Sequence, residues 1–234
     1  MRVFTRLAAL ALMASTLPHN AVALTFAEQE FVCPIGGERF KSKVVASETR
    51  FGQRLDLKPV GALAAPHPLP VCPNGFVMFK QRFTQDEVAA LTPVLLSPEY
   101  QAARKQHSTY YLAALLMEKN GVEPYQLAHV YLRASWQVEH DASPDRISLY
   151  RELAIARFDA FLKDNKNHDT RWWTAAIVAA ELERNLGRFE QSSARLAGLP
   201  VSELKPESPQ ARAIEQIKQL IAEKKSQPER FGVK

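Results

Sequence analysis

Two stretches of the chain read almost alike: "FVCPIGGERF" at Phe31–Phe40 and "PVCPNGFVMF" at Pro70–Phe79. Each stretch places one cysteine before a proline and then a turn that contains glycine. Glycine suits turns that need a left-handed backbone or a close approach between chain segments. The repeat predicts an N-terminal module built on two matching turns, and they hold Cys33 and Cys72, the only two cysteines in 234 residues.

The first 23 residues have the pattern of a secretory signal peptide. Arg2 and Arg6 give a positive start, Leu7–Leu17 is a short apolar run, and the small-residue triplet "AVA" ends at Ala23. A retained membrane anchor is the alternative, but the apolar run is shorter than the roughly 20 residues that cross a bilayer. We predict cleavage after Ala23 and a periplasmic or secreted mature protein that has no membrane span.

Composition argues against several classes of function. The formal charge falls from +5 to +3 when residues 1–23 leave, because they carry two arginines and no acidic residue. The remaining basic residues are interspersed with acidic ones, so nucleic acid is not an expected partner. The sequence contains no HExxH, no GxSxG and no glycine-rich phosphate loop. We therefore expect no cofactor, and the motifs single out no catalytic residue.

The character of the sequence changes near Thr84. Residues 24–83 contain short apolar runs broken by prolines and glycines, which favours a small β-ribbon module with a proline-rich connector. Within it, "FVMFKQRF" at Phe76–Phe83 is expected to be a short strand. Residues 84–225 carry the signals of helices, and residues 226–234 read as a polar tail. The expected fold class is α+β and mostly α, with the β module packed on a helical array.

N-cap residues and prolines mark where the expected helices begin. Thr84 and Glu87 match a capping box, and Asn120-Gly121 is a typical helix stop. Behind these signals, apolar residues recur at helical spacing, for example from Tyr150 to Phe161. The start signals lie at Thr84, Ser97, Glu123-Pro124, Ser143, Asp169 and Ser208.

Residues 172–200 match the tetratricopeptide pattern in part. An alanine-rich helix leads into "LGRFE" at Leu186–Glu190, and a second helix and a proline follow. The pattern prefers alanine where Ser192 stands. The preceding helix pair, residues 123–164, is longer than one 34-residue unit, so we expect one recognisable repeat and one stretched repeat.

The two cysteine turns and the helices together resemble a known family. In "CPIGG" and "CPNGF" the frame is similar to the paired CPxCG knuckles of a zinc ribbon, with Gly36 and Gly75 in place of the second cysteines. The stretches "YLAALLMEKNGVEPYQLAHVYLRASWQVE" and "AAIVAAELERNLGRFEQSSARL" resemble an uncharacterised bacterial family, domain of unknown function 2225. That family joins such knuckles to tetratricopeptide-like helices. The resemblance covers roughly residues 31–199 and implies a fold, since the family has no assigned reaction.

The resemblance also implies a role for the cysteines. The leading cysteines of two knuckles share one metal, so their sulfur atoms lie close together. In an oxidising compartment, and with two of the four ligands replaced, this arrangement implies a Cys33–Cys72 disulfide. Two alternatives stay open: a zinc site completed by other ligands, for which His67 is the histidine nearest Cys72, and a pair of free, reactive thiols.

The helical half offers a candidate binding surface at Trp173, Glu181 and Arg184. Trp172 and Trp173 can form a platform, although burial of Trp172 at a helix start is the plainer interpretation. We expect an exported, non-enzymatic binding or scaffold protein that uses a helical-repeat surface for a protein or peptide partner. The alternative is a thiol- or metal-dependent enzyme with a site between the two modules, built from Cys33 or Cys72, a histidine and Glu181.

Overall fold

The computed structural model describes residues 24–63, 66–141 and 143–232. It confirms the expected fold class, since the protein is a mixed α+β structure that is 51% helical. The predicted signal peptide, residues 1–23, lies outside the described residues, and the first strand begins at Leu24. In the part of the chain that is described, no helix combines the length and the apolar character needed to cross a membrane.

The strands form two separate antiparallel hairpins. In the first hairpin, Val32 pairs with Arg39 beside the connecting turn and Leu24 pairs with Glu48 at the open end. A bulge interrupts this ribbon, because Phe26 pairs with Val45 and Thr25 pairs with Ser47, which leaves Ala46 without a partner residue. The strands in the described part of the chain are β1 (Leu24–Val32), β2 (Arg39–Glu48), β3 (Arg50–Gln53) and β4 (Pro59–Gly61).

Eight α-helices follow the strands within the described residues, and six of them begin directly after a start signal in the sequence, whereas the helices that begin at Thr109 and Phe189 do not. Thr84 accepts the Glu87 amide while Glu87 accepts the Thr84 amide, so the capping box is present. Ser97, Asp169 and Ser208 cap their helices in the same way. The helices are α1 (Gln85–Leu96), α2 (Pro98–Ala103), α3 (Thr109–Lys119), α4 (Pro124–Gln137), α5 (Pro144–Asp164), α6 (Thr170–Asn185), α7 (Phe189–Ala197) and α8 (Pro209–Ala222), with a 3₁₀ turn at Val201–Glu203.

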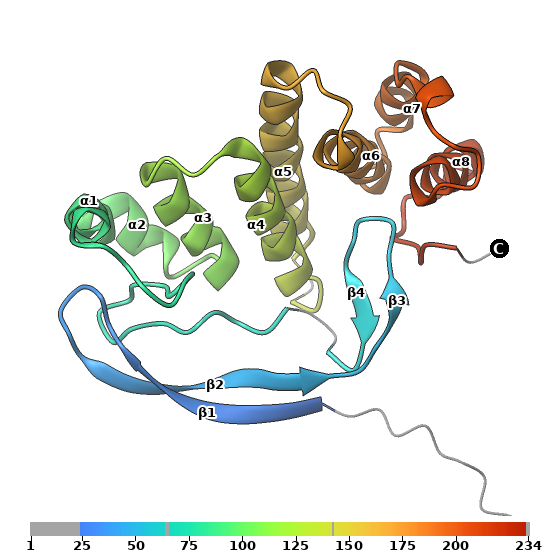
Figure 1. Cartoon of the computed structure of the whole chain (residues 1–234). Coiled ribbons are helices and arrows are strands. Elements are labelled where there is room, and N and C mark those ends of the chain that lie inside the picture. The colour runs from blue at the N-terminus through green and yellow to red at the C-terminus, as the bar shows by residue number, and fades with distance from the viewer. Residues whose placement is uncertain (1–23, 64–65, 142, 233–234) are drawn as a thin grey trace, which may run out of the picture.

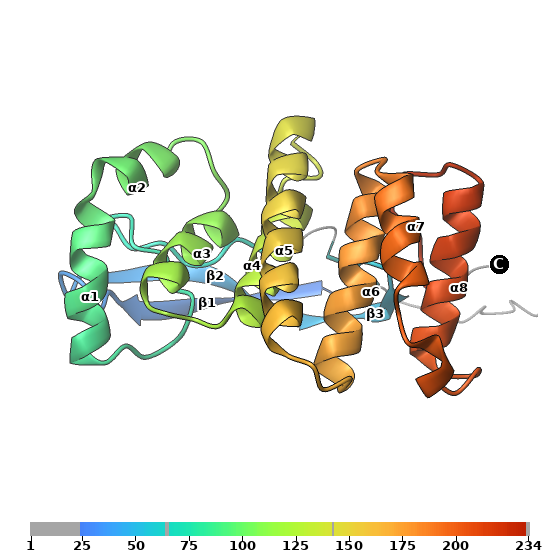
Figure 2. The same cartoon turned by 90° about the horizontal axis from the view of Figure 1, so that it is seen from above.

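The helices form an arch over the strands (Figure 1). The β1–β2 ribbon runs lengthwise beneath α1 to α5, and the β3–β4 hairpin lies beneath the other end, near α6 and α8. Seen from above, the helices stand side by side along the length of the ribbon (Figure 2). The ribbon therefore follows the inner side of the arch instead of forming a separate unit at one end of it.

The residues expected to form a separate β module contribute to the cores between the helices. Cys33, Cys72 and Phe76 pack in one buried cluster with residues of α1, α2 and α3. Leu55, in the turn between β3 and β4, packs in another cluster with Trp173 and with residues of α8. The boundary near residue 84 thus separates kinds of secondary structure and does not separate two cores.

Two other parts of the chain differ from the expectation. Phe76–Phe83 is not a strand, because it forms only an isolated bridge between Val71 and Val77. Its phenylalanines pack against one another instead. Residues 226–232 of the expected polar tail are attached to the fold: Leu55 donates its amide to the Glu229 carbonyl at 3.0 Å, and Phe231 donates to the Gln53 carbonyl at 3.0 Å.

The helix pair α6–α7 has the features that suggested a tetratricopeptide unit. Gly187 takes a φ of +74° in the tight connection between the two helices, a backbone conformation that favours glycine. Ser192, where the pattern prefers alanine, is fully buried, and its hydroxyl donates to the Ala180 carbonyl at 2.7 Å. The serine is small enough for α6 and α7 to pack closely here, and its hydroxyl is hydrogen-bonded.

Candidate functional site

The two cysteine turns meet, and Cys33 forms a disulfide with Cys72. Their Cα atoms lie 5.8 Å apart, and both residues are almost fully buried. The two turns have similar backbone hydrogen bonds. The Cys33 amide donates to the Glu38 carbonyl in the first turn, and the Cys72 amide donates to the Phe76 carbonyl in the second. The pairing implied by the zinc-ribbon resemblance is therefore present, with a covalent bond between the two leading cysteines.

Side chains reinforce this junction between the turns. Asn74 donates its side-chain amide to the Ile35 carbonyl at 2.6 Å, which links one turn to the other. Arg104 from the helical half donates to the Asn74 carbonyl at 3.0 Å. Gly75 has a φ of +92°, and a Cβ at this position would overlap the guanidinium of Arg104. The positive φ favours glycine here, and a larger residue would also have to displace the Arg104 guanidinium from its place beside the turn.

The candidate zinc ligand His67 lies elsewhere. Its Nε2 is 3.0 Å from the Lys43 carbonyl on β2, and its ring packs near Phe26. Among the described residues, no group of three or more histidine, cysteine, aspartate or glutamate side chains is arranged to hold a metal ion. His67 instead attaches the proline-rich connector to the ribbon.

The predicted binding surface on α6 is buried. Trp173 is 5% exposed, and Glu181 and Arg184 are fully buried. Arg184 donates to both carboxylate oxygens of Glu181 and to backbone carbonyls of the C-terminal segment, at Lys225 and Gln227. Burial raises the pKa of Glu181, although its bonds to Arg184 oppose this. These residues hold the C-terminal segment against α6 and present no surface to a ligand.

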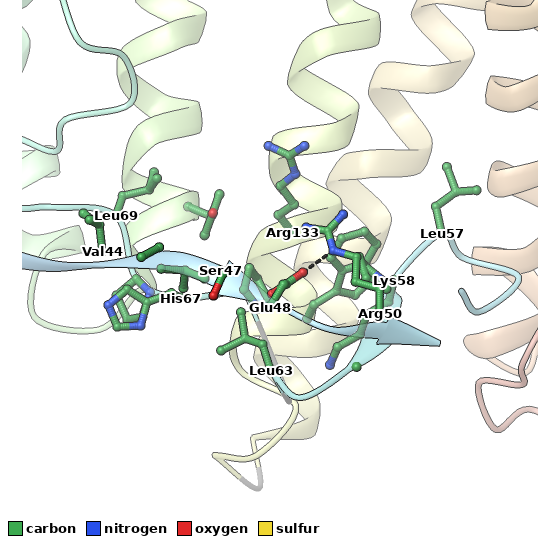
Figure 3. Close-up of a pocket in the computed structure, with 18 of the residues that line it drawn as sticks. Val44, Ser47, Glu48, Arg50, Leu57, Lys58, Leu63, His67, Leu69 and Arg133 are labelled. Atoms are coloured by element: carbon green, nitrogen blue, oxygen red, sulfur yellow. Dashed lines mark hydrogen bonds and ion pairs between the residues drawn. The ribbon is translucent and has the colours of Figure 1, made fainter. Parts of the chain in front are cut away.

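A groove of about 700 Å³ lies between the ribbon, the connector and α4. One wall is the second half of β2, Val44–Glu48, and another is the connector, whose described residues there include Leu63 and Pro66–Pro70. Figure 3 shows the labelled residues gathered around the end of β2, with Arg133 coming from α4. The volume falls within the roughly 300–1,000 Å³ range of ligand sites, which are usually concave and mostly apolar.

Arg133 is the charged group in this groove that lacks a partner. It is exposed, and it forms no hydrogen bond or ion pair with any residue in the described part of the chain. Two other cations in the groove are paired, because Arg50 binds Glu48 and Lys58 binds Glu139. The groove therefore has a free positive charge among apolar walls, and this combination suits a ligand with an acidic group and an apolar body.

Lys58, which lines the groove, belongs to a buried ionic cluster. Arg54 donates to Glu139 at 2.7 and 3.0 Å and to Asp56 at 2.9 Å, and Lys58 also pairs with Glu139. Burial alone would raise the pKa of Glu139, but the bonds and charges of Arg54 and Lys58 outweigh it and hold the pKa below its ordinary value. Burial lowers the pKa of Lys58 in spite of its bond to Glu139. The cluster fixes the turn between β3 and β4 against α4.

His129, a residue of α4, lines the groove and is neutral at neutral pH. Its ring makes edge contacts with Tyr125 and Phe158. Burial disfavours the charged imidazolium, and the charges of Arg133 and Arg171 also oppose protonation, so the pKa of His129 falls to about 4. The side chain therefore adds an uncharged polar group to a mostly apolar wall.

Comparison with known proteins identifies no relative: no protein-family model, no curated protein and no solved structure matches the chain.

The sequence did not reveal this groove. Arg133 stands on the polar side of an amphipathic helix, where an arginine is usually solvated and has no further role. What distinguishes it is the ribbon that passes opposite, and that relationship depends on contacts between residues far apart in the sequence. The proline-rich connector was a signal of irregular structure, but nothing in it indicated that it would form a wall.

Proposed function

We propose that the protein is an exported, non-enzymatic binding protein whose working site is the groove between β2, the connector and α4. The observation that carries this proposal is the unpaired Arg133 in a groove of about 700 Å³ with apolar walls. An arginine guanidinium binds carboxylates through two parallel hydrogen bonds, and Arg133 has no carboxylate partner among the described residues. The site differs from the helical-repeat surface expected from the sequence, because the ribbon covers the inner side of the arch.

Export is part of the proposal. A disulfide persists in oxidising compartments such as the periplasm or the cell exterior, and Cys33 and Cys72 form one. We also propose that the protein is related to the family called domain of unknown function 2225, because both combine two similar turns with a helical array.

The alternative of a thiol-dependent enzyme needs a reactive sulfur atom. Both cysteines take part in the disulfide, and no cysteine is free in the described residues. Alkylation of the denatured protein with and without reductant separates the two functions. Two blocked thiols agree with a binding protein, and a thiol that reacts without reductant would favour the enzyme.

A blocking substitution tests the groove itself. Ala46 is exposed on β2 and lines the groove, so Ala46→Trp places a large ring in it. Ala27 is exposed on β1 and does not line the groove, so Ala27→Trp is the matched control. Native mass spectrometry of protein purified from the exporting compartment should find the same bound ligand on wild type and Ala27→Trp, and none on Ala46→Trp. The same ligand mass on all three proteins would refute the assignment of the groove.

A further inference from the structure

Among the described residues, no strand pairs with the edge of β2 that faces the groove. The ribbon has two strands, so β1 takes one edge of β2 and leaves the other edge outside the sheet. An unpaired strand edge presents amide and carbonyl groups in a row, and it is a natural template for another extended chain. The question is whether this edge is covered by the connector or open to the groove.

The connector contacts this edge at both ends of the groove. At one end the Ala62 amide donates to the Thr49 carbonyl at 3.1 Å, and at the other the His67 ring binds the Lys43 carbonyl at 3.0 Å. Between them, residues 44–48 of β2 line the groove. No backbone hydrogen bond joins residues 44–48 to a described residue of the connector. The described residues of the connector therefore bond to the chain at the two ends of this edge and form no backbone hydrogen bond with residues 44–48 between them.

The bulge in the ribbon lies inside the same interval. Ala46 has no partner residue on β1, because the register shifts between Thr25 and Phe26. Bulges reorient the backbone and occur next to functional sites more often than elsewhere. Here the bulge lies in the wall of the groove, where it disturbs the pairing to β1 just beside the free edge.

Charge and length then restrict the occupant. Arg133 supplies an unpaired positive charge on the α4 side of the groove. An extended chain advances about 3.4 Å per residue, so the interval between Lys43 and Thr49 has room for about five residues. We propose that the groove binds an extended peptide segment that adds as a strand to the free edge of β2 at Val44–Glu48 and pairs a carboxylate with Arg133. This inference rests on the proposed function, since it names the ligand class of the same groove.

Alternate N-methylation of a bound peptide tests the strand. A random hexapeptide library with free C-terminal carboxylates is selected on the mature protein, and the best binder is remade with N-methyl groups on odd or on even residues. In a ladder, successive amides point to opposite edges. One set should therefore weaken binding by about tenfold or more, since it removes hydrogen bonds and adds a clash, and the other set should leave binding nearly unchanged.

Arginine variants test the charge. Arg133→Gln should weaken the selected hexapeptide by about tenfold, as expected for the loss of one charge-assisted pair. Arg82 is exposed, has no partner among the described residues and lies before α1, so Arg82→Gln is the matched control. Equal effects of the two variants would overturn the pairing with Arg133.

Dodecanoate separates failure of this inference from failure of the proposed function. One outcome is that dodecanoate binds only when Arg133 is present and Ala46 is unchanged, while the two N-methylated peptides bind equally well. In that case the groove is a site for small amphipathic acids, and strand addition is overturned. If neither the hexapeptide library nor dodecanoate binds, or if Ala46→Trp leaves their binding unchanged, the groove is not the working site and both proposals are overturned.

Discussion

The indole of Trp136 on α4 donates a hydrogen bond of 3.0 Å to the carboxylate of Asp56 in the turn between β3 and β4. Asp56 is 1% exposed and also binds Arg54 and the Lys58 amide. One buried carboxylate thus joins a hairpin near the N-terminus to a helix in the middle of the arch. Trp136 and Lys58 also line the groove, so this contact lies beside it.

Removal of the Asp56 carboxylate should destabilise the whole protein. Asp56→Ala leaves buried donors on Trp136 and Arg54 without their acceptor, and breaking a buried ion pair costs about 3–5 kcal/mol. Urea denaturation followed by circular dichroism measures the free energy of unfolding. Asp86→Ala, at an exposed residue in the first turn of α1, is the control and should change it by less than about 1 kcal/mol. A loss below about 1 kcal/mol for Asp56→Ala would contradict the anchoring role.

Loss of the disulfide should loosen the region around the cysteine turns first. The Cys33→Ser, Cys72→Ser double variant lacks the disulfide, which closes a loop between residues 39 positions apart in the sequence. In the chain-entropy model such a loop contributes on the order of 4 kcal/mol. Limited proteolysis should therefore cleave the variant between Phe31 and Phe83 while fragments containing α5 to α8 stay intact. Simultaneous degradation of the entire chain would show that the turns and the distant helices unfold as one unit.

Stability should fall below neutral pH because of His129. Its pKa is about 4 in the folded protein and about 6.5 in an unfolded chain. The unfolded state therefore binds more protons between these values, and the free energy of unfolding decreases as the pH falls from about 6.5 to about 4, by about 3 kcal/mol at most. His129→Phe should remove this part of the pH dependence in urea titrations at pH 7.5, 5.5 and 4.5.

The exposed His140 provides the control for this titration. His140→Phe should keep the slope of wild type between pH 6.5 and 4. If His129→Phe also keeps that slope, other groups cause the loss of stability in acid.

Enlargement of Ser192 should separate α6 from α7. Ser192 is fully buried and contacts the Ala180 carbonyl, so Ser192→Leu forces a larger side chain into the helix crossing. Overpacking of this kind costs about 1–3 kcal/mol. Thermal unfolding should show a lower midpoint for Ser192→Leu, whereas Ser193→Leu, at the exposed neighbouring residue, should stay within a few degrees of wild type. Equal midpoints would mean that the crossing tolerates a large residue.

Arg133 should be dispensable for stability. It is exposed and has no partner among the described residues, and surface substitutions of this kind change stability by about 0.5 kcal/mol or less. Arg133→Ala should therefore unfold at the same urea concentration as wild type. A clear loss of stability would indicate that the arginine has a structural role, and it would remove the main argument for a ligand in the groove.

Local signals explain what the sequence predicted correctly. A capping box such as Thr84 with Glu87 depends on residues three positions apart, and six of the eight described helices begin at signals of this local kind. The matching turns at Cys33 and Cys72 also carry their information locally, and the resemblance to zinc knuckles supplied the pairing. These features need no knowledge of the rest of the chain.

The groove and the buried ion pairs depend on distant residues, and the sequence did not predict them. Glu181 and Arg184 read as polar residues on the outer face of a helix, yet the C-terminal segment covers them. Arg54, Asp56 and Lys58 alternate with leucines, which is typical of a half-exposed strand, yet they are largely enclosed, and Arg54 and Lys58 pair with Glu139 just after α4. Hydrophobic patterning assigns charged residues to solvent, so it is misleading wherever charges are buried in pairs.

The bonds of Gln53 and Leu55 to the segment at Glu229–Phe231 have a consequence for how the protein folds. The hairpin is synthesised early and its neighbour in the fold is synthesised much later, so the loop between them must close before Leu55 is covered. Contacts of such long range slow folding. Until residues 229–231 are available, the hairpin lacks this neighbour and Leu55 stays uncovered, so we expect the native state to form only after that segment has been made.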